Sequence, residues 1–282
     1  MNYQEEETLL ALTLEPPKKA PSRKAVQAGI LLDRIFQRDP SQGGCFVEAT
    51  GAQGSGKTSL LLGFAQKIIR EHPEELVLWR ESANCPCQWN KFDGEVRILV
   101  EKKYKIKIRR QDDRSIAHEI EVRYFEGFVQ LFTMLKPGCL NVLYFRDATS
   151  WVELLKQLVM TPGFKSIFWD EYEDLLPEHS SGIIWKTNAT FSNVIKQVRK
   201  GGITLVCATQ SNSDVDFRVR KKLNMWIYLY GAKLDSQSPI TPAAIHSLRI
   251  GSAWIDSGHV FYGQFTFPPF KPKPVVYIIE EC

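Results

Sequence analysis

The sequence predicts an α/β fold built on a mainly parallel sheet with helices on both faces. Three observations support this prediction. Apolar segments of strand length alternate with segments of helical periodicity along most of the chain. One strand–loop–helix unit contains Gly51 to Thr58, which fits the pattern G-x-x-x-x-G-K-[ST]. The 282 residues are 44% hydrophobic, enough to bury a large core in one large domain or two small ones.

The first elements surround that motif. Residues 25–37 carry apolar side chains at helical spacing and predict a helix beside the core. Residues 44–50 form a short apolar strand before the motif, and residues 59–70 form a helix after it. Residues 76–79 are expected to be a second buried strand.

The same alternation returns later in the chain. We expect strands at 140–145, 166–169, 203–208 and 225–229, and helices at 150–160 and 184–199. Residues 253–262 have the pattern of a β-hairpin, with Asp256-Ser257-Gly258 in its turn. A proline-rich connector at 268–274 then leads to a closing strand at 275–279. Together these features predict a C-terminal β extension at about 250–282.

The alternation is interrupted between about residues 83 and 138. Apolar residues recur at period two in 96–100 and again in 104–108, which predicts a β-hairpin with one apolar face. Basic side chains occupy the other face and its surroundings: Arg97, Lys102, Lys103, Lys105, Lys107, Arg109 and Arg110. A solvated charged face is one interpretation. The excess of basic over acidic residues favours the other, a contact with a nucleic-acid phosphate backbone.

The bulk composition sets the remaining limits. Residues 1–22 are polar and proline-rich, and we interpret them as a mobile arm preceding a single domain at 23–282. The net charge of +4 says little about partners. Neither a secretory signal nor an 18-residue apolar run is present, so we expect a cytoplasmic protein without a membrane segment. Docking to a membrane complex or a capsid stays open.

The six cysteines divide into two groups. Cys45, Cys139 and Cys207 lie in apolar strand-like segments and are expected in the core. Cys85 and Cys87 form a close pair that we interpret as part of a surface loop. A redox-sensitive pair and a zinc half-site are the alternatives, although a zinc site would need a second pair of ligands.

The motif predicts a phosphate-binding loop of nine residues, Gly51, Ala52, Gln53, Gly54, Ser55, Gly56, Lys57, Thr58 and Ser59. Its glycines permit backbone angles that let successive N–H groups point at phosphate oxygens. The N-terminus of the following helix adds partial positive charge. Lys57 would bridge the β- and γ-phosphates of ATP, and the Thr58 hydroxyl would hold Mg²⁺.

Two carboxylates follow the apolar strand at 166–169. A parallel strand would deliver Asp170 to the edge of the sheet where the loop also lies. Asp170 would help to hold Mg²⁺, and Glu171 would polarise the attacking water. Glu173 and Asp174 continue the acidic run, so the assignment could shift by a few residues.

Gln210 ends another apolar strand, after Thr209. A polar amide at this position suits a sensor of the terminal phosphate, and a solvated loop is the alternative.

These blocks, together with residues 197–211 and 214–229, resemble the HerA/FtsK superfamily over roughly residues 40–265. That group includes conjugative coupling proteins, viral packaging ATPases and zonula-occludens-toxin-like phage assembly ATPases. The resemblance implies a RecA-like P-loop NTPase of the ASCE type that forms a hexameric ring and moves double-stranded DNA with ATP. It also implies that Arg199 is an arginine finger acting on the neighbouring subunit, with Arg218 and Arg220 in reserve.

Two other functions remain compatible with these residues. One is an ATP-dependent assembly or scaffold ATPase that acts on protein partners. The other is a nucleotide-gated switch of the replication-initiator kind, which the Gln210 block disfavours.

Overall fold

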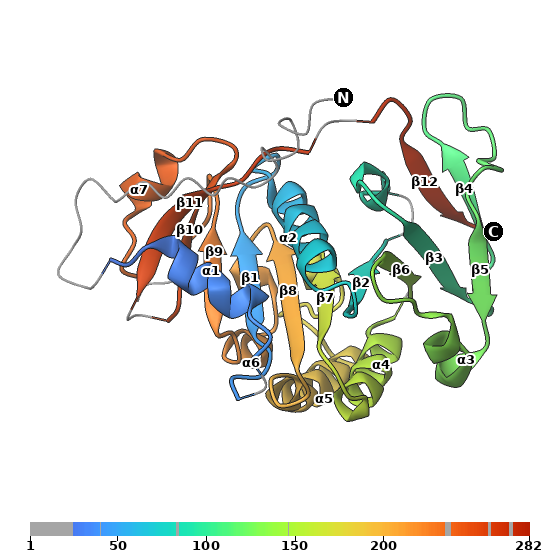
Figure 1. Ribbon diagram of the computed structural model, residues 1–282, viewed down its shortest axis with the longest axis horizontal. Helices are drawn as coiled ribbons and strands as arrows, with labels where there is room; N and C mark the ends of the chain where they lie inside the picture. The colour runs from blue at the N-terminus through green and yellow to red at the C-terminus, as the bar shows by residue number, and fades with distance from the viewer. Residues whose placement is uncertain are drawn as a thin grey trace.

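A ten-stranded mixed sheet forms the centre of the molecule, in the order β11-β10-β9-β1-β8-β7-β2-β6-β3-β5 (Figure 1). The computed structural model describes residues 25–39, 41–82, 85–145, 147–234, 238–258, 261–270 and 273–282. The predicted arm at 1–22 lies outside these residues. The strands of the sheet are β1 (Phe46–Thr50), β2 (Leu76–Arg80), β3 (Val96–Glu101), β5 (Val122–Phe125), β6 (Leu140–Tyr144), β7 (Lys165–Trp169), β8 (Ile203–Thr209), β9 (Met225–Tyr228), β10 (Ser252–Asp256) and β11 (Tyr262–Thr266).

The strands from β9 to β5 in this order pair in parallel, so their carboxyl ends share one edge of the sheet. The antiparallel pair β10 and β11 extends the sheet beyond β9. All residues of β1, β6, β7 and β8 are buried, as expected for strands covered on both faces. The α/β class, the parallel core and the C-terminal hairpin are therefore confirmed.

Helices cover both faces of the sheet. They are α1 (Ala28–Phe36), α2 (Lys57–Glu71), α3 (Gly127–Met134), α4 (Ala148–Met160), α5 (Gly182–Val198), α6 (Phe217–Arg220) and α7 (Pro242–His246). The buried side chains of α1 and α2 join one core cluster with residues such as Val47 and Val77. Those of α3, α4, α5 and α6 join a second cluster on the opposite face, with residues such as Leu78 and Ile167. Within the described part of the chain, none of these helices has the length and apolar character needed to span a bilayer.

The predicted hairpin at 96–108 is wrong in its pairing. Strand β3 enters the main sheet between β5 and β6. Strand β4 (Ile106–Arg110) pairs instead with β12 (Tyr277–Glu281), and the two form a separate antiparallel sheet at one end of the molecule (Figure 1). The period-two pattern identified each strand correctly, but such a pattern contains no information about the partner. The closing strand therefore leaves the C-terminal hairpin and covers the interrupting segment.

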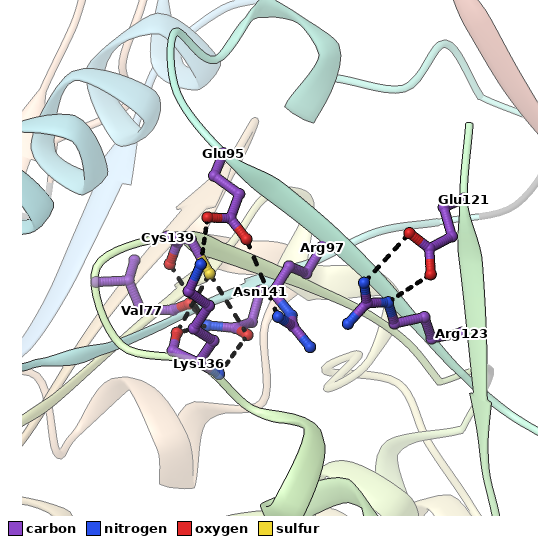
Figure 2. A network of polar contacts seen from close by, with 8 residues as sticks. All are labelled: Val77, Glu95, Arg97, Glu121, Arg123, Lys136, Cys139 and Asn141. Carbon is purple, nitrogen blue, oxygen red and sulfur yellow. Dashed lines mark hydrogen bonds and ion pairs between the residues drawn. The ribbon is translucent and has the colours of Figure 1, made fainter. Parts of the chain in front are cut away.

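The basic residues of that segment are largely neutralised inside the chain. Figure 2 shows Arg97 beside Glu95, and Arg123 beside Glu121. Ion pairs with acidic residues also engage other members of the predicted cationic set: Lys102 with Glu126, Lys103 with Glu101, Arg109 with Glu280, and Arg110 with Glu119. These acids come from β3, from β12 and from the loops before and after β5. The predicted excess of positive charge on this face is thereby reduced, which weakens its case as a phosphate-backbone contact.

Candidate active site

The loop predicted to bind phosphate connects β1 to α2 at the carboxyl edge of the sheet. Gly54 and Gly56 have φ angles of 76° and 97°, a conformation that side chains rarely adopt. Gly56 is the N-cap of α2. Gly51 is required for a different reason, because a Cβ there would lie 2.7 Å from Ser55 Oγ and 2.9 Å from Leu229 Cβ. The loop thus meets the geometric conditions for cradling an anion at a helix N-terminus.

The Lys57 side chain folds back over this loop. Its Nζ donates hydrogen bonds to the carbonyl oxygens of Gly51 at 2.8 Å and Ala52 at 3.1 Å. The residue is 8% exposed. Burial lowers the pKa of the Lys57 ammonium, and the charges of Asp170, Glu173 and Glu171 oppose that effect. A cation is therefore held at the mouth of the loop, close to several acidic groups.

Thr58 and Asp170 meet directly. Thr58 Oγ1 donates to Asp170 Oδ2 at 2.5 Å. Burial raises the pKa of the Asp170 carboxyl, while the Thr58 hydroxyl and the Lys57 charge lower it. Oxygen ligands of this kind suit Mg²⁺, which normally keeps several waters and phosphate oxygens in its shell. Among the described residues, no group of three or more His, Cys, Asp and Glu side chains could hold a metal by itself. The pair therefore fits Mg²⁺ carried by a bound nucleotide.

Glu171 follows Asp170 in a left-handed conformation, with φ 49° and ψ 51°. For a residue other than glycine this conformation costs about 1–2 kcal/mol. Burial raises the pKa of the Glu171 carboxyl, as do the neighbouring charges of Asp170 and Asp174. A carboxylate at this position can accept a proton from water once a nucleotide is bound beside it.

Gln210 reaches the same edge at the end of β8, which lies between β1 and β7. Its backbone N–H donates to Glu173 Oε1 at 3.1 Å, and the residue itself is exposed. This contact ties the end of β8 to the acidic turn after β7. An amide at this junction could report on a phosphate in the loop, which stays a prediction.

The three arginines proposed as fingers lie elsewhere. Arg199 ends α5 at the amino edge of the sheet, where its Nε donates to the carbonyl of Gln42 at 3.0 Å. Arg218 is bound to the Asp216 carboxylate and stacks over Trp185, with 4.6 Å between the guanidinium and the ring centroid. Arg220 lies 3.5 Å from Glu178. Since Arg199 lies on the edge opposite its own loop, it could act on a nucleotide only in a neighbouring subunit.

Sequence reasoning missed several buried polar residues behind the site. Arg80 and Glu81 follow the apolar segment 76–79 directly, and the rule that identified Asp170 would have found them. Burial raises the pKa of Glu81 to about 8. Glu48 sits in β1, where the Tyr172 hydroxyl donates a hydrogen bond to its carboxylate. The role of Glu48 could not be predicted from the sequence, because an acid in a central strand can be interpreted only when its hydrogen-bond partner is known.

The structure also tests the predictions made for the cysteines. Cys45, Cys139 and Cys207 are buried, as expected. Cys85 is exposed and Cys87 is buried, and both are free thiols. Neither belongs to a metal cluster among the described residues, so the zinc alternative has no support.

No protein-family model matches the sequence, and no curated protein matches it either. Solved structures do match. The DNA-packaging ATPase B204 of Sulfolobus turreted icosahedral virus aligns with a TM-score of 0.54 and 15% identity, over 83% of this chain and 100% of that one. The chain has the fold of a P-loop ATPase. At such identity the likeness concerns the fold alone.

Two further structures complete the comparison. The genome packaging NTPase B204 of Sulfolobus turreted icosahedral virus 2, in complex with ATP-gammaS, aligns with a TM-score of 0.50 and 13% identity, over 83% of this chain and 100% of that one. The N-terminal domain of the zonular occludens toxin of Neisseria meningitidis reaches a TM-score of 0.36 at 13% identity, over 82% of this chain and 87% of that one. The latter score is too low to support any inference.

The buried Glu48 leads to a prediction about pH. Burial raises its pKa from the ordinary value of 4.5 to about 7, against the lowering effect of the Tyr172 hydroxyl. The folded state therefore holds this proton more tightly than the unfolded state. The resulting stabilisation is complete below the unfolded pKa and is lost as the pH rises through about 7. Glu48→Gln should lack this dependence.

Urea denaturation at several pH values checks the prediction. Between about pH 5 and about pH 8, the wild type should lose roughly 2–3 kcal/mol of unfolding free energy more than Glu48→Gln does. All other titrating groups are common to both proteins and cancel in the comparison. Parallel pH curves for the two proteins would mean that Glu48 titrates normally.

Proposed function

We propose that this protein is an ATP-hydrolysing motor that binds and translocates double-stranded DNA during packaging, transfer or processing. One observation supports the nucleotide chemistry above all others: the Thr58 hydroxyl bonds to the Asp170 carboxylate directly beside the buried Lys57 ammonium. The loop predicted to bind phosphate, the hydroxyl proposed to hold Mg²⁺ and the acidic strand end thus lie together, which supports the proposal. The assignment to DNA is supported by the fold shared with a viral DNA-packaging ATPase.

In this proposal each residue has a separate task. The loop from Gly51 to Ser59 holds the phosphates through its N–H groups, and Lys57 balances the charge of the β- and γ-phosphates. Thr58 and Asp170 would hold Mg²⁺, and a cation bound there would supply positive charge beside the terminal phosphate. Glu171 takes the proton of the attacking water, and Gln210 senses whether the terminal phosphate is present.

The same proposal includes a homo-oligomer, most simply a hexameric ring in the cytoplasm. Arg199 then serves as the finger that stabilises charge on a neighbouring subunit's nucleotide. Its position at the edge opposite its own loop is compatible with this role, because a finger of this kind must come from another chain.

An assembly ATPase of the phage type, acting on protein partners, is the second candidate. The internal ion pairs of the β4 region favour it, because they reduce the positive charge available to DNA. In this case a protein partner, not DNA, would increase ATP turnover.

Measuring ATP turnover with and without duplex DNA separates the two candidates. The motor should turn over ATP faster with DNA, and the logarithm of its DNA affinity should fall linearly with the logarithm of salt concentration. A mass measurement of the same samples with nucleotide should show a ring. An ATP turnover rate that is unchanged by DNA would favour the assembly ATPase. No ATP turnover under any condition would refute both candidates.

A further inference from the structure

The buried guanidinium of Arg80 lies directly behind the acidic turn. Arg80 is the last residue of β2, a strand that lies between β6 and β7 in the sheet. It pairs in register with Trp169, the residue before Asp170. Its side chain is 7% exposed, so it is withdrawn from solvent and from any large ligand.

One nitrogen of this side chain holds two consecutive peptide groups. Nη1 donates to the carbonyl oxygens of Asp170 at 2.8 Å and Glu171 at 3.1 Å. Because both acceptors belong to the backbone, the contact constrains the orientation of both peptide planes. These planes flank the left-handed Glu171, at φ 49° and ψ 51°. The two hydrogen bonds therefore constrain the backbone conformation of Glu171, the proposed base.

An ordinary structural ion pair does not explain this burial. Within the described residues, no carboxylate oxygen lies within ion-pair distance of Arg80, and its Nε has no hydrogen-bond partner. The contrast is Arg38, a second largely buried arginine, which pairs with the Glu75 carboxylate at the amino edge of the sheet. Among the described residues, the hydrogen bonds of the buried Arg80 guanidinium go to the two carbonyls of the acidic turn, which indicates that its role is to hold that turn.

We propose that Arg80 is the positioning residue for Glu171: it fixes the Asp170–Glu171 turn so that the Glu171 carboxylate faces the water beside the terminal phosphate, without touching the nucleotide itself. This inference rests on the proposed ATPase function of the same site. We call the two hydrogen bonds from Arg80 to the carbonyls of Asp170 and Glu171 the brace. A displacement of about 1 Å at a catalytic group can reduce the rate about 100-fold, so a loss of this size is expected when the brace is removed.

Three variants test the proposal: Arg80→Met, Arg80→Lys and Arg38→Met. Arg80→Met should lower kcat about 100-fold while the KM for ATP changes less than about 3-fold, since the loss falls on the transition state. Arg80→Lys keeps the charge and can reach one carbonyl, so it should restore part of kcat. Arg38→Met removes a similarly buried guanidinium elsewhere and should change neither kcat nor the KM for ATP.

Amide hydrogen exchange across residues 168–176 gives a readout independent of turnover. The turn amides of Asp174, Leu175 and Leu176 bond to backbone carbonyls within this segment. They should exchange faster in Arg80→Met than in the wild type or Arg38→Met. If exchange there is unchanged, the proposed brace is refuted, whether or not the protein hydrolyses ATP.

The two proposals can fail separately. Normal kcat in Arg80→Met, in a wild type that turns over ATP, would refute the positioning role and leave the ATPase intact. Loss of kcat with an equal loss in Arg38→Met would also refute it, by exposing a general effect on stability. If Arg80→Met exchanges faster only at residues 168–176, and the wild type shows no ATP turnover, the brace is supported and the ATPase function is refuted.

Discussion

Replacing Lys57 with alanine should reduce ATP turnover by at least about 100-fold, the loss typical of a group that stabilises transition-state charge. The ammonium bonds to the carbonyls of the loop and lies near three acidic residues, so its charge is held where the phosphates are proposed to bind. ATP affinity should also fall, because the same charge contacts the phosphates in the ground state. Turnover and binding of a fluorescent ATP analogue measure the two effects.

Lys67→Ala is the matched control for this variant. Lys67 lies on the same helix and forms a partly exposed pair with Glu71. Pairs of this kind contribute about 0.3–0.5 kcal/mol, so its removal should leave both turnover and nucleotide binding unchanged. If Lys57→Ala retained wild-type turnover, the loop would not be the catalytic phosphate site.

Glu171→Gln should bind ATP normally and hydrolyse it about 100- to 10,000-fold more slowly, the range associated with loss of a general base. Glutamine keeps the size of the side chain, but it cannot accept the proton. The brace from Arg80 acts on the backbone, so the turn itself should stay intact in this variant. Single-turnover hydrolysis combined with analogue binding separates the chemical step from affinity.

Asp174→Asn tests the register of the acidic run. Asp174 is an exposed acid three positions after Glu171, in the same short 3₁₀ turn. Its replacement should change turnover little if Glu171 is the base. A large loss in Asp174→Asn beside normal hydrolysis in Glu171→Gln would transfer the role to Asp174.

The core of the site could be predicted from the sequence because its determinants are local. Gly54 and Gly56 are needed where the backbone turns left-handed, and the apolar segment before Asp170 is a strand in any packing that buries it. Parallel strands bring their carboxyl ends to one edge, so the meeting of Thr58 with Asp170 followed from these elements. Gly51 was also identified, although the structure shows that it is required for space and not for its backbone angles.

The partners of the interrupting segment could not be predicted in the same way. The alternation in 104–108 identifies β4 as a strand, but its partner β12 lies at the far end of the chain. Arg109 and Glu280, which pair across these strands, are 171 positions apart. The cationic face inferred from nearby residues was therefore incomplete, since Glu280, which neutralises Arg109, comes from the far end of the chain.

The sequence by itself determined the α/β class, the phosphate loop and the acidic strand end, because glycine conformation, apolar periodicity and strand direction act over short distances. Tertiary structure alone decided three features: the pairing of β4 with β12, the placement of Arg199 at the opposite edge, and the contact of Arg80 with the Glu171 turn. Each depends on which distant segments pack together. Which segments pack together depends on burying the apolar faces of strands and helices that are distant in the sequence, and no single segment contains that information.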